Sequence, residues 1–279
     1  MEKLTGKTAL VTGSTDGVGR VVARRLGEAG ARVLVHGRDA ERGGGVVGEI
    51  EKAGGAATFL KADLASLAEV RRLAAAVKDT SGRLDVLISN AGIGTAGDVR
   101  QESADGIELR FAVNYLAGFL LTSLLLPLLR ASTPARIINV SSAGQYPIDF
   151  ADVMLASGYS GMRAYCQSKL AQVMFTIDLA AELAGSGVTA NCLHPATYMN
   201  TAMVRRAGVA PVNTVEEGAD AILNLAVSPA LGNRTGLYFN GLREALGHSQ
   251  AYDAQARRQL RALSFALTGL SDHGPAAAG

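Results

Sequence analysis

Short apolar runs rich in β-branched residues alternate along the chain with longer segments whose apolar positions recur at helical spacing. The short runs are nearly continuous, which is typical of strands that helices cover on both faces. Repeated strand–helix–strand order therefore predicts an α/β fold with a doubly wound, mostly parallel, seven-stranded sheet. The predicted strands comprise residues 7–11, 32–35, 57–60, 84–89, 136–140, 188–193 and 237–239.

Helix signals and the absence of a linker indicate how the chain is organised. Ser66 with Glu69, and Thr214 with Glu217, have the spacing of capping boxes, which begin helices. No composition shift or Pro/Ser-rich linker divides the sequence, so we expect one domain. That domain would comprise a core over residues 4–247, a terminal helix over 251–267 and a frayed tail over 272–279 of a 279-residue chain.

A cluster of glycines interrupts the helical pattern near residue 45. Gly43, Gly44, Gly45 and Gly48 lie where the second helix is expected. Each glycine in a helix costs about 1 kcal/mol relative to alanine. We therefore predict that residues 40–55 are locally weak, with faster hydrogen exchange than the core.

Composition excludes several classes of function. Hydrophobic residues make up 48% of the chain and charged residues 19%, which is enough apolar material for a large core. The formal charge of 27 − 25 = +2, without a basic cluster, does not indicate a nucleic-acid-binding protein. Cys166 and Cys192 lie inside predicted regular elements, which favours reduced thiols over a disulfide. The histidines and cysteines do not have metal-ligand spacing, so we expect no metal site.

The longest apolar stretch covers residues 115–129. It is shorter than the roughly 20 residues that a spanning helix needs, and it contains Thr122, Ser123 and Pro127. A buried helix is the better interpretation, and an interfacial helix is the alternative. The first residues show no apolar signal-peptide core, so we expect a soluble, cytoplasmic protein without a spanning segment.

A glycine-rich turn follows the first predicted strand and begins a helix. Glycines allow a tight turn and a close approach to a ligand, and amides at a helix N-terminus attract a pyrophosphate. The spacing Gly-x-x-x-Gly-x-Gly in this position indicates a dinucleotide site, although a plain strand–helix turn is the alternative. The candidate binding residues are Gly13, Ser14, Thr15, Asp16, Gly17, Val18 and Gly19.

The end of the second strand bears on which dinucleotide binds. Arg38 lies where an arginine would meet the 2′-phosphate of NADP(H). Asp39 follows it, and could serve as the acid that binds ribose in NAD(H) sites or cap the next helix. We therefore favour NADP(H) over NAD(H). A solvated surface charge is the alternative role for Arg38.

Tyr165 and Lys169 are four residues apart on one predicted helix, so their side chains share a face. A phenol with a pKa near ~10 is a poor base at neutral pH, and a nearby ammonium lowers that pKa. A tyrosine tuned in this way exchanges protons with an alcohol or carbonyl oxygen. The spacing alone is common, and a solvated helix face produces it equally well.

Further polar residues follow other strands at the carboxyl edge of the predicted sheet, where open α/β sheets bind ligands. Asn90, Ala91 and Gly92 follow the fourth strand, and Ser141 and Ser142 end the fifth. The remaining residues of this group are Asn114, His194, Pro195 and Thr197.

The ordered set Thr-Gly-x-x-x-Gly-x-Gly, Asn-Ala-Gly, Ser and Tyr-x-x-x-Lys resembles the short-chain dehydrogenase/reductase family over nearly the whole chain, with its Rossmann-type fold. The resemblance implies that Tyr165 is the general acid/base and that Lys169 lowers its pKa and holds the nicotinamide ribose. Ser142, the second of the serine pair, would orient the substrate oxygen. Asn114 would support a water-linked proton path. The resemblance extends cofactor contact to Asp63, Leu64, Asn90, Ala91, Gly92, Tyr165, Lys169, Pro195, Thr197 and Thr201.

Two departures from the family pattern concern the substrate side. Ala196 follows Pro195 where the family usually has glycine. The stretch between Ser142 and Tyr165 is longer than usual, and its added part, residues 145–162, is similar to the retinol-dehydrogenase-like and protochlorophyllide-reductase-like branch. We favour an apolar wall or lid of the substrate pocket over a decorative surface loop for this segment.

These observations predict an NADP-dependent oxidoreductase that interconverts an apolar carbonyl compound and its alcohol by hydride transfer. Alternatives are a dinucleotide-binding sensor or scaffold without turnover, and an epimerase or dehydratase on the same fold. The long apolar helices over residues 114–129 and 162–183 suggest pairing across a two-fold axis, as in many relatives, so we expect a homodimer or homotetramer.

Overall fold

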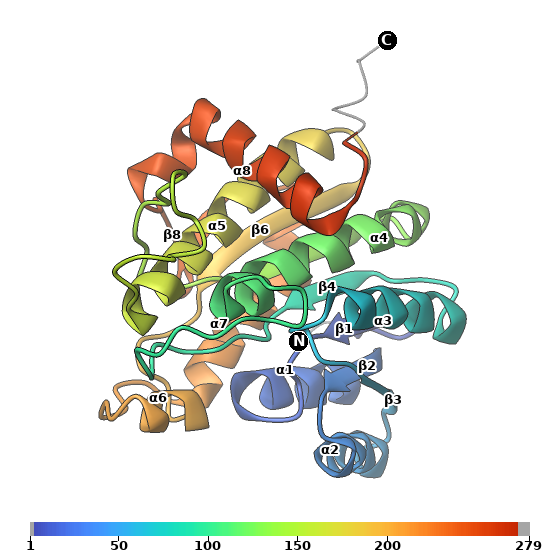
Figure 1. The fold of residues 1–279 in the computed structure, drawn as a ribbon. Helices are drawn as coiled ribbons and strands as arrows, with labels where there is room; N and C mark the ends of the chain where they lie inside the picture. Colours follow the sequence, from blue (N-terminus) through green and yellow to red (C-terminus); the bar gives the residue numbers. More distant parts are fainter. Residues whose placement is uncertain (1–2, 273–279) are drawn as a thin grey trace.

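One sheet forms the centre of the molecule in the computed structural model, which describes residues 3–272 (Figure 1). Its strand order is β3-β2-β1-β4-β5-β6-β7-β8, and every pairing is parallel except that of β7 with β8. The predicted doubly wound, mostly parallel fold is therefore confirmed. The strands are β1 Thr8–Val11, β2 Arg32–Gly37, β3 Ala56–Lys61, β4 Val86–Ser89, β5 Ala135–Val140, β6 Val188–His194, β7 Tyr238–Asn240 and β8 Arg243–Ala245.

The prediction of seven strands was one too few for the residues that the structure describes. β8 pairs antiparallel with β7, and the register joins Asn240 to Arg243 across a two-residue loop. Gly241 begins that loop with φ +60°, a conformation that two-residue hairpins need and glycine adopts without strain. A glycine at the first loop position is a hairpin signal in the sequence, but a three-residue strand containing Arg243 and Glu244 does not show an apolar pattern.

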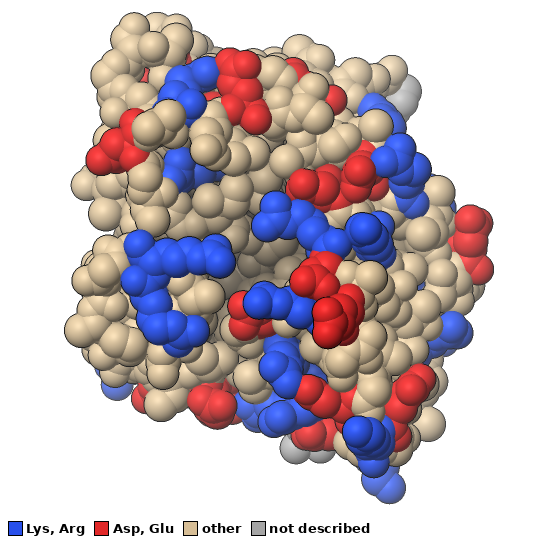
Figure 2. Space-filling view, turned by 60° about the horizontal axis from the view of Figure 1, so that its bottom comes forward, with Lys and Arg blue, Asp and Glu red and all other residues tan. Residues whose placement is uncertain are grey.

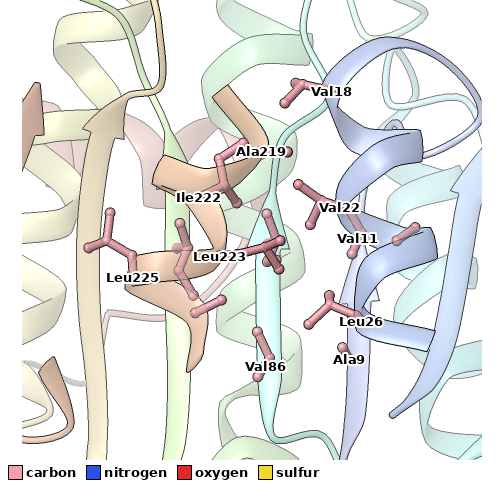
Figure 3. Close-up of a cluster of buried hydrophobic side chains, with 14 of the residues drawn as sticks. Ala9, Val11, Val18, Val22, Leu26, Val86, Ala219, Ile222, Leu223 and Leu225 are labelled. Atoms are coloured by element: carbon pink, nitrogen blue, oxygen red, sulfur yellow. The ribbon is translucent and has the colours of Figure 1, made fainter. Parts of the chain in front are cut away.

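Helices cover both faces of the sheet. On one face lie α1 Gly17–Glu28, α2 Ala40–Lys52 and α7 Val215–Val227. On the other lie α3 Leu67–Thr80, α4 Ala117–Ala131 and α5 Gly161–Glu182. The alternation of strand side chains supplies both cores: Ala9 and Val11 pack with α1 and α7 (Figure 3), whereas Leu10 packs with α3 and α4.

Several shorter helices and a terminal helix complete the fold. The terminal helix, α8 Ala254–Thr268, begins and ends close to its predicted bounds and packs on the outer side of α5 (Figure 1). The predicted frayed tail falls mostly outside the described residues. The remaining elements are the π-helix η1 Phe111–Leu116, the short helix α6 Ala202–Arg206, and the 3₁₀ turns η2 Pro229–Leu231 and η3 Ser249–Tyr252.

Side-chain caps explain where the helices begin. Thr214 and Glu217 form the predicted reciprocal capping box at α7. Ser66 caps α3 by accepting a hydrogen bond from the Glu69 backbone, so this helix start is also confirmed. The Glu69 carboxylate, however, accepts from the Asp63 backbone N–H at 2.6 Å instead of returning to the cap residue. The second box is therefore only half formed, because Glu69 ties down the end of the loop after β3.

The long apolar helix lies inside the fold. η1 and α4 together run over Phe111–Ala131, and among the described residues this is the one helix long and apolar enough to cross a membrane. Its most apolar 18-residue window is 61% buried, and Leu120, Leu121 and Leu125 pack in the core beneath the sheet. The burial confirms the predicted buried helix.

Candidate active site

The glycine loop lies at the carboxyl end of β1, beside the point where the chain order of the strands reverses between β1 and β4. Gly13 has φ +64°, and a Cβ there would lie 2.8 Å from the Ala91 Cα. A Cβ at Gly19 would collide with the Gly13 carbonyl oxygen. These two positions therefore require glycine, and the bare backbone between β1 and α1 forms a cradle that fits a pyrophosphate.

Asn90 and Thr12 hold this cradle from behind. The Asn90 Nδ2 donates to the carbonyl oxygens of Thr12 at 2.9 Å and Gly13 at 3.1 Å. The Thr12 Oγ1 in turn accepts from the backbone N–H groups of Asn90 and Ala91 at 2.9 and 3.1 Å. The sequence suggested that Asn90 contacts the cofactor, and the structure shows that its amide nitrogen is engaged with the glycine loop.

His36 is a further residue of this site that the sequence analysis did not single out. Its Nδ1 accepts a hydrogen bond from the Gly13 backbone N–H at 3.1 Å, and the side chain is buried. Burial lowers the pKa of His36 to about 4, so at neutral pH the ring is uncharged and Nδ1 is free to accept. A histidine closing the second strand, two residues before Arg38, is the signal that could have identified it.

Charged side chains surround the far end of the glycine loop. Arg38 follows β2 with its side chain 75% exposed, and its Nη1 lies 3.9 Å from an Asp63 carboxylate oxygen. Asp39 caps α2, because its Oδ1 accepts from the Glu41 and Arg42 backbone N–H groups at 3.0 and 3.1 Å. Of the two roles that the sequence left open for Asp39, the structure shows the helix cap, which uses the Oδ1 atom.

A groove of about 270 Å³ lies between α1 and α2 beside these residues. Figure 2 shows the face that carries α1, α2 and α6, where basic side chains stand on both sides of a hollow and acidic ones lie among them. Basic side chains at such an edge attract a phosphorylated ligand. The groove is lined by Thr15, Asp16, Arg20, Arg42, Gly45, Val46 and Glu49.

Tyr165 and Ser142 meet at the carboxyl end of β5. Ser160 caps α5, which brings Tyr165 onto the first turns of the helix opposite the strand end. The Ser142 hydroxyl is close enough to Tyr165 to lower the pKa of its phenol, and the Ser142 Oγ accepts from the Gly144 backbone N–H at 3.1 Å. Ser141, by contrast, donates its hydroxyl to the Lys169 carbonyl oxygen at 2.7 Å. Of the two serines, Ser142 is therefore the one that faces the phenol.

The predicted lowering of the Tyr165 pKa by Lys169 is wrong for the protein alone. Burial raises the pKa of Tyr165, and the hydrogen bond with Ser142 only partly opposes that effect. The Lys169 Nζ lies 5.7 Å from the centre of the Tyr165 ring, and its two hydrogen bonds go to Val140 and Gln172. The phenol is therefore held in its protonated form, which suits a proton donor.

Lys169 is buried and bonded on two sides. Its Nζ donates to the Val140 carbonyl oxygen at 2.8 Å and to the Gln172 Oε1 at 2.9 Å. Burial lowers the pKa of Lys169 to about 7. Burial also lowers the pKa of the neighbouring His194, and the charge of Lys169 adds to that effect.

Asn114 connects the loop after β4 with α5. Its Oδ1 accepts from the Ile93 backbone N–H at 2.7 Å, and its Nδ2 donates to the Ile93 carbonyl at 3.1 Å and the Ser168 Oγ at 2.9 Å. The residue lies within the π-helix η1, a widened turn that is frequent at functional sites. A Cβ at Gly92 would lie 3.3 Å from the Asn114 Oδ1 and 3.6 Å from the Lys169 Nζ, so these three residues converge.

The segment after β6 lies at the same edge of the sheet, across from the glycine loop. It leaves the sheet at Pro195 and returns through a backbone hydrogen bond from Val212 to Tyr198 at 3.0 Å. The Thr197 hydroxyl bonds the His194 Nε2 at 3.1 Å. Thr201 begins α6, and its Cγ2 would lie 3.3 Å from a Cβ on Gly17. Of the predicted cofactor residues of this segment, Thr201 thus lies against the glycine loop, and Thr197 is held by His194.

The added segment over residues 145–162 is an integral part of the fold. Ile148, Val153 and Leu155 are buried. Ile148 exchanges two backbone hydrogen bonds with the side chain of Gln250, at 2.7 and 3.0 Å. These contacts anchor the segment in the fold, and its role as a wall or lid of the substrate pocket stays a prediction.

At its far end the segment is tied to the loop after β4 and to η1. The Tyr159 hydroxyl accepts from Arg110 at 2.5 Å and donates to Glu108 at 2.9 Å. Arg110 also donates to the carbonyl oxygens of Gly94 at 2.8 Å and Ala96 at 2.6 Å. The buried Arg110 guanidinium therefore fixes the 94–97 loop to the segment that carries Tyr159.

Comparison with known proteins agrees with this geometry. Residues 7–210 match the sequence profile of the family described as short chain dehydrogenase. The chain is 38% identical to human (Homo sapiens) retinol dehydrogenase 13 over 96% of its own length and 86% of the relative's.

Solved structures give the same result. A putative uncharacterized protein from Mycobacterium paratuberculosis superposes with a TM-score of 0.78 at 30% identity, covering 97% of this chain and 96% of that one. The Pseudomonas aeruginosa RhlG/NADP active-site complex superposes with a TM-score of 0.70 at 32% identity, covering 86% and 97% respectively. The chain therefore belongs to the short-chain dehydrogenase family and is an oxidoreductase of that family.

Proposed function

We propose that this protein is an NADP-dependent dehydrogenase/reductase that interconverts an apolar, retinoid-like aldehyde or ketone and its alcohol. The observation that carries the proposal is the juxtaposition of Ser142 and Tyr165, with the buried Lys169 Nζ 5.7 Å from the centre of the Tyr165 ring. This group lies at the same edge of the sheet as the glycine cradle. Proton transfer can therefore occur next to a bound nicotinamide.

In the reductive direction, NADPH when bound would supply the hydride. Ser142 and Tyr165 donate hydrogen bonds to the carbonyl oxygen and polarise it. As negative charge develops on that oxygen, the Tyr165 O–H bond breaks and its proton passes to the new alcohol. The phenolate that remains is stabilised by the Lys169 ammonium, and oxidation of the alcohol follows the same steps in reverse.

The preference for NADP(H) rests on Arg38 and its surroundings. The Arg38 side chain is 75% exposed at the end of β2, where an arginine accommodates a 2′-phosphate. Asp39, which could have bound ribose hydroxyls, caps α2 through its Oδ1 atom. Arg42 stands nearby, 3.4 Å from Asp16. Bound NADP in the related Pseudomonas structure is consistent with this preference.

Apolar side chains near Tyr165 support an apolar substrate. Met162 and Tyr198 are 45% and 49% exposed, and Tyr146 on the added segment is 48% exposed. Met162 precedes Tyr165 on α5 by three residues, and Tyr198 is close enough to Tyr165 to raise its pKa. Exposed apolar groups grouped in this way favour an apolar ligand. The name of the human relative suggests the retinoid class.

The direct test is an NADPH- and NADH-coupled assay over a panel of carbonyl compounds and alcohols that includes all-trans-retinal and all-trans-retinol. We expect turnover with retinal and NADPH, and a loss of about 10² or more in kcat for Tyr165→Phe with cofactor affinity retained. Arg38→Ala should raise the KM for NADPH and leave that for NADH nearly unchanged.

Other outcomes would select another function. Tight NADPH binding without turnover of any compound would indicate a sensor or scaffold. Product identification by mass spectrometry would reveal an epimerase or dehydratase. Near-full activity of Tyr165→Phe would exclude the proposed proton donor.

A further inference from the structure

The ammonium of Lys169 is held by a side chain that the mechanism above does not use. Gln172 lies three residues after Lys169 on α5, so both side chains share a helix face. Its Oε1 accepts from the Lys169 Nζ at 2.9 Å, and both residues are buried, at 4% exposure each. The second acceptor, the Val140 carbonyl at 2.8 Å, belongs to the backbone and cannot be varied by substitution.

A buried ammonium needs such acceptors because burial favours the neutral amine. An amide oxygen can accept hydrogen bonds but cannot donate them, and it binds the charged ammonium form of lysine more strongly than the neutral amine form. None of the hydrogen bonds described for the Lys169 Nζ reaches a carboxylate in residues 3–272. The charge on this lysine therefore depends on neutral acceptors.

The other groups around Lys169 do not supply a negative charge. Tyr165, on the same helix, is protonated, and His194 from the end of β6 would add positive charge if it took up a proton. Asn114 from η1 and Ser141, which directly follows β5, are neutral, and both have other partners. Gln172 is thus the side-chain acceptor that favours the charged form.

We propose that Gln172 is a positioning residue that keeps the Lys169 side chain charged and directs it toward Gly92 and Tyr165; the catalytic part of this inference rests on the proposed function. Two of the three ammonium protons are taken by Val140 and Gln172. The third is left for the side on which Gly92 approaches, where a Cβ would lie 3.6 Å from the Nζ. That side is where the nicotinamide ribose is expected.

The protonation state of the Tyr165–Lys169 pair sets the pH range in which the protein can reduce a carbonyl. Reduction needs a protonated phenol and a charged ammonium, so activity falls when the pair loses its first proton. Burial lowers the pKa of Lys169 to about 7, which makes the lysine the group that loses it. An acceptor that favours the ammonium therefore extends reductive activity to higher pH.

Two substitutions at residue 172 separate this role from a merely structural one. Gln172→Met removes the acceptor with little change in shape, and Gln172→Glu replaces it with a group that carries negative charge when ionised. The matched control is Gln167→Met, because Gln167 is also buried on α5 but donates to the Val153 carbonyl at 2.6 Å. Circular dichroism and thermal unfolding show which variants fold, and Gln172→Glu serves as the second variant if Gln172→Met does not.

The first measurement does not require turnover. Protein labelled with ¹³C at the lysine ε-carbons is titrated by NMR, and Lys169→Arg assigns the signal among the six lysines of the chain. We expect the Lys169 midpoint to fall by roughly one pH unit in Gln172→Met and to rise by a similar amount in Gln172→Glu. The control should keep the midpoint of the unsubstituted protein. Unchanged midpoints in both residue-172 variants would overturn the proposal.

The second measurement is the pH profile of kcat for carbonyl reduction. The pH at which kcat falls on the alkaline side should be lower in Gln172→Met and higher in Gln172→Glu. A structural defect would instead lower kcat in both variants without changing that pH. If that pH is unchanged in both variants, the catalytic part of the inference is overturned. If the NMR midpoints move but no variant, nor the unsubstituted protein, reduces any carbonyl, the proposed function fails and the charge-holding role of Gln172 stands.

Discussion

Several buried or partly buried polar residues of the site hold the backbone of the crevice. Asn90 donates to two carbonyl groups of the glycine loop, Asn114 bonds both backbone groups of Ile93, and His36 accepts from Gly13. A buried polar group is stable only when its partners are in place, so each of these side chains fixes the loop that it bonds. The shape of the crevice therefore depends on single hydrogen bonds.

His36 leads to a prediction about stability and pH. Its pKa is about 4 in the folded protein against about 6.5 when unfolded, so the unfolded chain binds more protons between these values. Stability should therefore fall as the pH is lowered from about 6.5 to 4, by up to ~3 kcal/mol from this residue. His36→Asn keeps an acceptor but cannot titrate, so urea unfolding should show a smaller loss over this range. Parallel curves for the two proteins would exclude the effect.

The outcome at Tyr165 shows what residue spacing can and cannot establish. The spacing to Lys169 correctly placed the two side chains near each other. It did not reveal that burial would raise the Tyr165 pKa, because desolvation depends on residues from other elements. The role of His36 as an acceptor for Gly13 likewise depends on a neighbour from another element, whereas the Asp39 cap is local and was one of the two roles that the sequence offered.

At the scale of elements, α2 shows how one helix contains glycines with different roles. A Cβ at Gly43 would collide with the ring of Phe59 on β3, whereas Gly44, Gly45 and Gly48 have no atom within 4 Å of such a Cβ. The glycine at residue 43 permits close packing of helix on sheet. The predicted local weakness of residues 40–55 stays a prediction, although the helix itself is continuous.

The glycines give a matched pair of substitutions. Gly44→Ala should stabilise the protein by about 0.5–1 kcal/mol, because alanine loses less backbone freedom on folding. Gly43→Ala should destabilise it by about 1 kcal/mol or more, because the Phe59 ring must move. Chemical denaturation of both variants measures the difference. Equal effects of the two substitutions would show that packing against Phe59 does not matter.

Local patterns predicted most elements but not those held by distant contacts. The strands of the parallel sheet and the capped helices carry their signals in their own residues, such as Thr214 and Glu217. The edge strand β8 and the π-helix do not. Residues 145–162 are ordered by Gln250, Arg110 and Glu108, which lie far away in the sequence. Their sequence could indicate a wall but not what holds it.

At the scale of the whole molecule, α8 changes how a dimer could form. The expected pairing used the helices over residues 114–129 and 162–183. α8 covers α5, with Arg257 bonded to Asp178 at 2.6 Å and Arg261 to Glu182 at 3.1 Å. α5 is consequently buried within one chain over most of its length. The oligomeric state stays a prediction, as does the cytoplasmic location, but α5 is no longer the expected interface.

The α4 helix retains a partly exposed apolar stripe, which includes Leu124, Pro127 and Leu128. If the protein forms a homodimer, we expect this stripe to form the interface. Leu128→Glu should then convert the dimer to a folded monomer in light scattering. Arg258→Glu, at an exposed position of α8, is the matched control and should leave the dimer intact. A monomeric parent protein, or a Leu128→Glu dimer, would contradict this prediction.

The position of α8 also matters while the ribosome is still making the protein. The rings of Phe111, Tyr115 and Phe119 form a cluster, and α8 closes its outer side. The ring centres of Phe265 on α8 and Phe119 are 5.3 Å apart, and the hydroxyl groups of Tyr115 and Ser264 are hydrogen-bonded at 2.6 Å. Those partners are synthesised about 150 residues after the rings that they cover. A nascent chain with a finished sheet therefore still presents aromatic side chains to solvent. Chaperones that bind exposed apolar surface have a target on this protein until its last helix emerges.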